Sequence, residues 1–294
     1  MKVLLTGSTG QLGQEIINSK PQFINLIAPK RNELDLKDSE SCEKYIIDKK
    51  PDWVINCAAY TAVDNAEREI KLSKQINSYA PKAFTKGINR IKGNLLHIST
   101  NFVFDGEQNF PYLEDQITSP LNNYGYTKAL GEKLIFDSSE YRDNFIILRT
   151  SWVVSSRGKN FVLKMLKLLK GKDSVNVIYD QIGVPTSAKE LAKVCWRIID
   201  IKRHSNPPSI LHWSDAGVTS WYDLTLAIGD LAMELGILDN VAKVYPIKTK
   251  EYPTPAKRPK YSLLDFENTS KILNLEPNHW RKNLKEILTN YKKI

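Results

Sequence analysis

The sequence predicts an α/β fold in which a doubly wound parallel sheet is joined to a smaller mixed α/β region. In the first half of the chain, short apolar runs alternate with stretches of helical periodicity, as in buried parallel strands linked by crossover helices. After Thr150 this alternation fades, and prolines and aromatic residues become more frequent. We therefore divide the chain into a sheet domain, residues 1–152, and a second region, residues 153–294, some segments of which return to pack on the first.

The expected strands are the apolar runs at 3–5, 26–28, 53–55, 95–98 and 145–148. The expected helices lie at 12–18, 39–49, 66–86 and 126–137, and in the second region at 188–199 and 221–235. Residues 252–259 contain three prolines. Each proline restricts its own backbone and that of the residue before it, so an extended loop is expected there.

Composition indicates a globular protein of 294 residues, 41% of them hydrophobic, with enough apolar side chains for one large or two modest domains. No run approaches the roughly 20 apolar residues of a membrane span, and the first apolar run is too short for a signal peptide. We expect a cytoplasmic protein without a membrane partner. The net charge of +9 is spread along the chain, which argues against a nucleic-acid partner and suits an anionic cofactor and substrate. The three cysteines, Cys42, Cys57 and Cys195, are far apart and predict neither a disulfide nor a zinc site.

A glycine turn follows the first expected strand at once. Gly7, Gly10 and Gly13 are spaced three residues apart, with Gln11 and Leu12 at the start of the next helix. Such a turn lets the backbone approach a pyrophosphate at the positive end of a helix, where side chains would obstruct it. The pattern predicts a Rossmann-type dinucleotide site, with a plain structural turn as the alternative.

Basic residues stand at the tip of the second expected strand, where Pro29 is followed by Lys30 and Arg31. A carboxylate at this place binds the ribose hydroxyls of NAD, whereas an arginine accommodates the additional phosphate of NADP. We predict a preference for NADPH, with NADH as the alternative and Arg31 as the phosphate partner.

Tyr124 and Lys128 are four residues apart and therefore share one face of a helix. A neighbouring ammonium favours a phenolate, so we expect Lys128 to lower the pKa of Tyr124 and to make it a general acid or base near neutral pH. Thr100 lies at the carboxyl end of a central strand, where open α/β sheets bind ligands. Tyr126 is the rival tyrosine, but no lysine stands four residues beyond it. The alternative is an unremarkable aromatic and lysine on a helix surface.

Taken in order, the glycine turn, the strand that ends at Thr100 and the Tyr124–Lys128 pair resemble the extended short-chain dehydrogenase/reductase family. Further segments are similar to the dTDP-4-dehydrorhamnose reductase family, namely residues 56–64, 99–106, 120–125, 149–152, 180–186 and 258–259. The resemblance covers nearly the whole chain. It implies that Thr100 polarises a carbonyl, Tyr124 transfers a proton and Lys128 holds the cofactor ribose.

The same resemblance implies further ligand contacts. Cofactor contacts would be made by Asp35, Leu36, Ala58, Ala59, Tyr60 and Thr61, and substrate contacts by Val63, Thr100, Asn101, Trp152 and Arg258. Arg258 would pair with a diphosphate, which suits its planar fork of donors. Without the resemblance, a core aromatic for Trp152 and a solvated charge for Arg258 are the alternatives.

The sequence departs from the family pattern in two places. Asn101 and Phe102 stand where the family commonly has Asp and Tyr, so a carboxylate that could tune the acid and a hydroxyl that could touch the substrate are both absent. Some family members form a dimer through magnesium held by glutamates. Glu15 and Glu190 match two of those positions, but Asn290 stands at the third, so we assign no metal ligands and leave both magnesium and a homodimer open.

The activity that the resemblance implies is reduction of dTDP-4-dehydro-6-deoxy-L-mannose at its C4 ketone by NADPH, which gives dTDP-L-rhamnose for cell-surface polysaccharide. Two alternatives remain at this point. One is a nucleotide-sugar epimerase or dehydratase on the same scaffold. The other is an NADP-binding regulatory subunit like that of methionine adenosyltransferase.

Overall fold

A six-stranded parallel sheet forms the centre of the computed structural model, which describes residues 1–141 and 143–293. The strands are β1 (Lys2–Thr6), β2 (Asn25–Ile27), β3 (Trp53–Asn56), β4 (Asn94–Thr100), β5 (Phe145–Thr150) and β10 (Ile210–His212). They lie in the order β2-β1-β3-β4-β5-β10, and all pairs are parallel. The predicted doubly wound α/β fold is confirmed.

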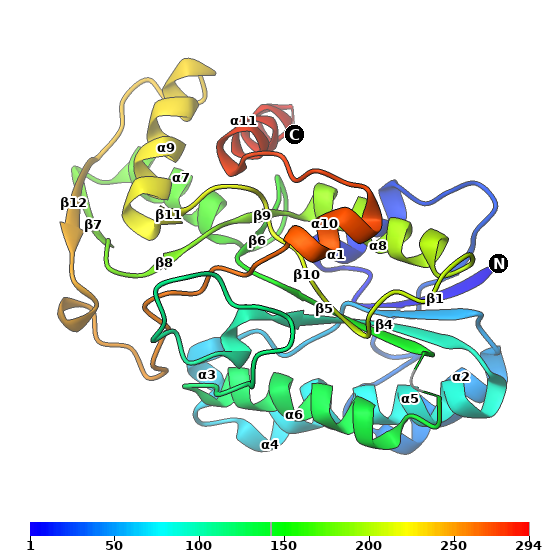
Figure 1. Ribbon diagram of the computed structural model, residues 1–294. Coiled ribbons are helices and arrows are strands. Elements are labelled where there is room, and N and C mark those ends of the chain that lie inside the picture. The colour runs from blue at the N-terminus through cyan, green and yellow to red at the C-terminus, as the bar shows by residue number, and fades with distance from the viewer. Residues whose placement is uncertain (142, 294) are drawn as a thin grey trace.

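Helices cover both faces of this sheet (Figure 1). One layer holds α1 (Gln11–Asn18) and α8 (Ala188–Ile201), and the other holds α2 (Ser39–Lys49), α5 (Ala80–Ile91) and α6 (Asn123–Ser138). Successive side chains of a strand point to opposite faces. Accordingly, Val3 and Leu5 belong to the apolar core under α1 and α8, whereas Leu4 belongs to the core under α2 and α5.

The expected helix at 66–86 is confirmed in part: a helical run extends without a break from Ile70 to Ile91, and a separate short helix ends at Ala66. The connection from β3 to β4 thus contains four labelled segments. They are α3 (Val63–Ala66), α4 (Ile70–Lys74), the π-helical turn η1 (Gln75–Tyr79) and α5. Within η1 the Asn77 amide bonds both the backbone nitrogen and the carbonyl oxygen of Tyr60. Turns of the π type are frequent at functional sites, and this one ties the helix to the loop after β3.

The second region is built around its own apolar cluster, at the end of the sheet where Figure 1 shows the yellow and orange segments. Its main elements are α7 (Phe161–Gly171), α9 (Trp221–Glu234), α11 (Trp280–Lys292) and the parallel pair β7 (Ser174–Ile178) and β12 (Lys243–Ile247). Shorter elements are β6 (Val153–Val154), β8 (Ile182–Gly183), β9 (Thr186–Ser187), β11 (Thr219–Ser220), α10 (Glu267–Leu273), η2 (Asn101–Val103) and η3 (Thr249–Glu251). Residues 252–259 form no helix or strand, as expected.

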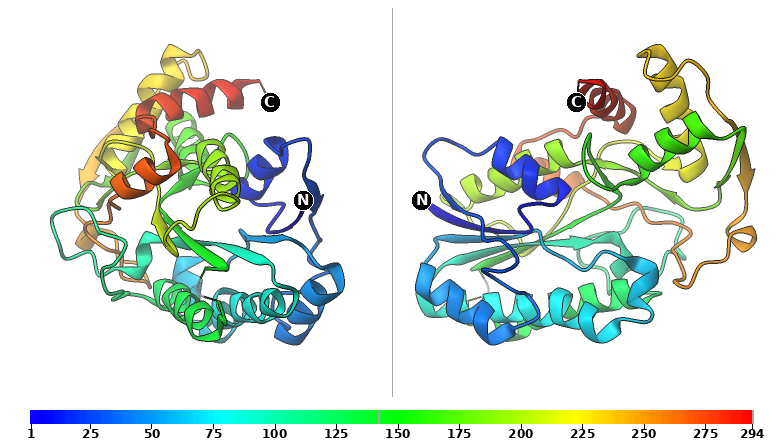
Figure 2. Two further views of the ribbon diagram at one scale, coloured as in Figure 1. Left: turned by 45° about the vertical axis from the view of Figure 1, so that its right-hand side comes forward. Right: turned by 180° about the vertical axis from the view of Figure 1, so that it is seen from behind.

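Segments from the second half of the chain complete the sheet domain (Figure 2). Ile210 to His212 of β10 pair with Ile147 to Arg149 of β5, and α8 packs against α1. The division at residue 152 stays a prediction. In the described ranges, no helix combines the length and the apolar character that a membrane crossing needs.

Candidate active site

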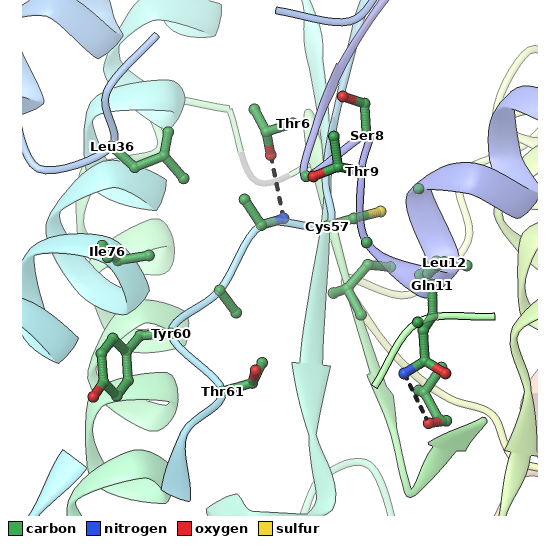
Figure 3. A pocket seen from close by; sticks show the side chains of 18 of the residues that line it. Thr6, Ser8, Thr9, Gln11, Leu12, Leu36, Cys57, Tyr60, Thr61 and Ile76 are labelled. Carbon is green, nitrogen blue, oxygen red and sulfur yellow. Dashed lines mark hydrogen bonds between the residues drawn. The ribbon is translucent and has the colours of Figure 1, made fainter. Parts of the chain in front are cut away.

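A cavity of about 1170 Å³ opens at the carboxyl ends of the parallel strands. The strand order reverses direction between β1 and β3, which is the point where open α/β sheets bind ligands. Figure 3 shows the cavity from close by, with Leu36, Ile76 and Tyr60 on one side and Gln11 and Leu12 on the other. Loops from several strands therefore enclose one site.

The structure brings most of the predicted site residues to this cavity. Its lining includes Gly7, Gly10, Gln11, Leu12, Gly13, Arg31, Asp35, Leu36, Ala58, Ala59, Tyr60, Thr61, Thr100, Tyr124, Lys128 and Trp152. Val63, Asn101 and Arg258 are not among the lining residues. The structure thus gathers the other predicted residues around one cavity, while the role of each residue stays a prediction.

The backbone of the glycine turn is packed too closely for side chains. A Cβ atom on Gly13 would lie 2.2 Å from the carbonyl oxygen of Gly7, so the turn closes only with glycine there. Gly10 caps α1 without a side-chain hydrogen bond, which leaves the backbone N–H groups of the first helical turn available to a ligand. A bare, positively polarised helix end of this kind fits a pyrophosphate, and the cavity volume accommodates a dinucleotide.

Charged residues gather where the loop after β2 reaches the cavity. Arg31 is exposed and lines it, as do Lys30 and Asp35. Hydrogen bonds and the charge of Lys37 hold the pKa of Asp35 below its usual range, and Arg31 adds to this effect. This end of the cavity thus presents an ionised carboxylate beside a guanidinium.

The loop after β3 is held in place by a side chain that sequence reasoning missed. Asn77 accepts from the Tyr60 backbone nitrogen at 2.8 Å and donates to the Tyr60 carbonyl oxygen at 3.1 Å. Asn77 is buried and also lies 3.1 Å from the Thr127 hydroxyl on α6. It therefore fixes the position of Tyr60 relative to the helix that carries Tyr124 and Lys128. A lone asparagine inside a helical run gave no signal that it binds a distant loop.

The start of α6 places Tyr124 beside the end of β4. Asn122 caps the helix by accepting from the backbone nitrogen of Gly125 at 2.8 Å, and Glu67 accepts from the backbone nitrogen of Asn123, also at 2.8 Å. A Cβ atom on Gly125 would lie 2.1 Å from the carbonyl oxygen of Phe102. Only glycine allows α6 to approach the segment after Thr100 this closely.

Tyr124 and Lys128 both line the cavity, but their proton affinities differ from the expectation. Burial raises the pKa of Tyr124, while a hydrogen bond with the Thr100 hydroxyl acts in the opposite direction. The expected lowering of this pKa by Lys128 is wrong for the protein alone. The lysine Nζ instead donates to the Ile98 carbonyl oxygen at 2.7 Å and lies 3.1 Å from His97 Nε2. A phenol with a raised pKa remains protonated at neutral pH, as a proton donor must.

A buried ion pair joins helix α6 to strand β5. The Arg149 guanidinium on β5 binds Glu132 on α6 through two nitrogens, at 2.7 Å from Nη2 and 3.1 Å from Nε. Both side chains are at most 5% exposed. The Ser99 hydroxyl donates to the same carboxylate, so Glu132 links the residue before Thr100 to the helix that carries Lys128. Glu132 lies four residues after Lys128, so the sequence alone could have placed the two side chains on one face of the helix.

Trp152 lies at the edge of the cavity in an unusual backbone conformation. Its φ is 41°, in the left-handed region that non-glycine residues rarely adopt. The indole stacks on Trp221 of α9, with ring centroids 3.4 Å apart. Such conformations cost about 1–3 kcal/mol and persist where the surroundings impose them, often at ligand sites.

Arg258 and Asn101 are engaged with the protein. Two nitrogens of Arg258 bind the two carboxylate oxygens of Asp64 at 3.0 and 2.7 Å. Asn101 is 1% exposed and donates to the Ser262 carbonyl oxygen at 3.0 Å. The substrate roles of both residues stay predictions.

The residues at the positions where some family members hold magnesium lie near lysine side chains. Glu190 binds Lys193 at 2.6 Å, while Glu15 and Asn290 line a separate cavity of about 340 Å³ together with Lys189 and other residues. Within residues 1–141 and 143–293, no group of three or more histidine, cysteine or acidic side chains is arranged to hold a metal ion.

Comparison with known proteins reveals similarity along the whole chain. Residues 1–293 match the family described as RmlD substrate binding domain. A dTDP-4-dehydrorhamnose reductase of Aggregatibacter actinomycetemcomitans is 36% identical over 97% of this chain and 98% of that protein. The crystal structure of such a reductase from Clostridium acetobutylicum gives a TM-score of 0.90 at 36% identity, covering 99% of this chain and 100% of that one. The Bacillus anthracis reductase in complex with NADP gives 0.89 at 28% identity, covering 98% and 99% of the two chains.

Proposed function

Because the chain belongs to the RmlD substrate binding domain family, we propose that it reduces the C4 ketone of dTDP-4-dehydro-6-deoxy-L-mannose with NADPH to give dTDP-L-rhamnose. The chain is an NAD(P)-dependent sugar-nucleotide reductase, and its relatives include named dTDP-4-dehydrorhamnose reductases. The observation that carries the finer proposal is one cavity lined by the glycine turn together with Thr100, Tyr124 and Lys128.

In the proposed reaction, NADPH supplies the hydride that reduces the C4 carbonyl. Tyr124 donates a proton to the carbonyl oxygen, and its raised pKa keeps the phenol protonated until then. Thr100 donates a hydrogen bond to the same oxygen, where negative charge develops in the transition state. Lys128 holds the nicotinamide ribose from the next turn of α6.

The test of this function is to incubate the protein with NADPH and dTDP-4-dehydro-6-deoxy-L-mannose and to follow the absorbance of the reduced cofactor. We expect one NADPH consumed for each dTDP-L-rhamnose formed, and no consumption without the sugar nucleotide. Conversion of the sugar without net loss of NADPH would instead identify an epimerase or a dehydratase. An absence of turnover would contradict the proposal.

The cofactor preference can be tested at Arg31, which we infer to be the partner of the NADP phosphate. Arg31→Ala is expected to raise the KM for NADPH about tenfold and to leave the KM for NADH nearly unchanged, because only NADPH loses a charge-assisted hydrogen bond. The measurement is the ratio of kcat/KM for the two cofactors. Arg90→Ala removes an exposed arginine on α5 that is paired with Glu43, and serves as the control. An unchanged ratio in Arg31→Ala would exclude this role for Arg31.

A further inference from the structure

A chain of buried side chains runs behind the cavity from the glycine turn to Lys128. Thr6 Oγ1 donates to Asn56 Oδ1 at 2.6 Å, and Asn56 Nδ2 lies 2.9 Å from His97 Nδ1. His97 Nε2 lies 3.1 Å from Lys128 Nζ. None of the four side chains is more than 3% exposed. Figure 3 shows the Thr6 end of this chain, where the hydroxyl faces a backbone nitrogen of the loop after β3.

The donors along this chain determine which nitrogen of His97 carries the proton. The Ala58 backbone N–H donates to Thr6 Oγ1 at 3.4 Å, so the hydroxyl proton is directed to Asn56 Oδ1. The Asn56 amide nitrogen then faces His97 Nδ1, which must accept. A neutral imidazole that accepts at Nδ1 carries its proton on Nε2. His97 is neutral, because burial and the charge of Lys128 hold its pKa well below its usual range.

The protonated Nε2 of His97 is therefore directed at Lys128 Nζ. An ammonium group has three donors and no lone pair, whereas a neutral amine can accept this hydrogen bond. Burial lowers the pKa of Lys128 to about 8, against the opposing effects of Glu132 on the same helix and of the Cys57 thiol after β3. Tyr124, a further titratable group one turn earlier on α6, lines the same cavity. From the hydrogen-bond argument, we infer that the contact with His97 also disfavours the ammonium form.

We propose that His97 is a positioning residue for the reductase reaction, which fixes Lys128 Nζ at the cavity wall and makes the lysine release its proton more readily. The inference rests on the proposed function, in which Lys128 holds the nicotinamide ribose as an ammonium group with three hydrogen-bond donors. Activity then falls as the pH rises through the pKa of Lys128. With His97 at this position, activity is lost at a lower pH. A side chain that accepted a hydrogen bond from Lys128 Nζ would move this loss to a higher pH.

His97→Gln tests the direction of this effect. A glutamine amide can turn its oxygen toward Lys128 Nζ and accept from the ammonium, which raises the pKa of the lysine. We expect the alkaline limb of the pH profile of kcat/KM to move up by about one pH unit. An unchanged limb, or one moved to lower pH, would overturn the inference.

His212→Gln is the matched control, because His212 is also fully buried, with Nε2 lying 3.2 Å from Arg149 and Nδ1 lying 3.1 Å from the Tyr112 carbonyl oxygen. Its replacement disturbs a similar buried imidazole, which, like His97, does not line the cavity, but whose Nε2 faces Arg149 where that of His97 faces Lys128. We expect it to reduce stability without moving the alkaline limb. A shift equal to that of His97→Gln would show that the effect is general destabilisation and would reject the inference.

The tautomer of His97 supplies a second test that requires no substrate. In the nitrogen-15 NMR spectrum of the unmodified protein, His97 should show a protonated Nε2 and an unprotonated Nδ1, with its signals identified by their loss in His97→Gln. The reverse tautomer would refute the inference. A wild-type protein that consumes no NADPH with the sugar nucleotide would refute the proposed function, while the tautomer would still decide the role of His97.

Discussion

Tyr124→Phe is expected to lower kcat about 10²- to 10⁴-fold, because it removes the proton donor of the proposed reaction. The ring remains, so the edge-to-face contact with Phe102, at a centroid distance of 5.6 Å, and the fold of α6 should persist. NADPH should bind with nearly unchanged affinity, since the hydroxyl acts on the carbonyl oxygen of the substrate. Steady-state kinetics and a fluorescence titration with NADPH measure the two effects separately.

The control for this change is Tyr126→Phe, on the same helix. Tyr126 is 43% exposed, and its ring faces Lys74 Nζ at 5.2 Å. It is absent from the cavity lining. We expect nearly full activity in this variant. Normal turnover in Tyr124→Phe, or an equal loss in Tyr126→Phe, would contradict the assignment of the proton donor.

Glu132→Gln is expected to reduce the free energy of unfolding by about 3–5 kcal/mol, because it leaves the buried Arg149 charge without its counter-ion. The amide keeps the shape of the carboxylate and can still accept from Ser99, so the loss reports charge rather than volume. A loss of this size is a large part of the about 5–15 kcal/mol that stabilises a typical domain. Urea unfolding followed by circular dichroism measures it.

Asp137→Asn supplies the comparison, because Asp137 pairs with Lys133 on the solvent side of the same helix. Both partners are at least 50% exposed, and an exposed pair of this kind contributes about 0.2–1 kcal/mol. Equal losses for the two variants would mean that burial of the Glu132–Arg149 pair has no energetic consequence.

Local patterns in the sequence predicted the elements that carry the glycine turn. The expected helix at 39–49 agrees with α2, whose N-cap Asp38 accepts from the backbone nitrogens of Glu40 and Ser41. The first strand and the helix after the turn were predicted to within one residue at each end. Capping and periodicity are properties of neighbouring residues, so a single sequence contains them.

Some elements were missed although the signal was present. Asn160 caps α7, and Val162, Met165, Leu166 and Leu169 follow at helical spacing and are buried. α11 repeats this pattern with Trp280, Leu284, Ile287 and Leu288. By contrast, β10 has only three residues, and its partner β5 lies far away in the sequence, so no local pattern distinguishes it.

Motif and order identified most of the residues that the fold gathers around one cavity, while their roles stay predictions. The supporting polar residues were not identified, because Asn56, Asn77 and His97 act through partners that only the fold brings near. A histidine inside the apolar run of β4 was the one visible irregularity. The pKa of Tyr124 was predicted in the wrong direction, because burial cannot be read from a four-residue spacing.

The pairing of β10 with β5 matters while the chain is being synthesised. When residues 145–150 leave the ribosome, the outer edge of β5 presents unpaired backbone groups until residues 210–212 have also emerged. An open edge of this kind is a template for pairing with another chain. In the interval between these two segments, the edge of β5 is therefore open to pairing with another chain, so aggregation can begin there.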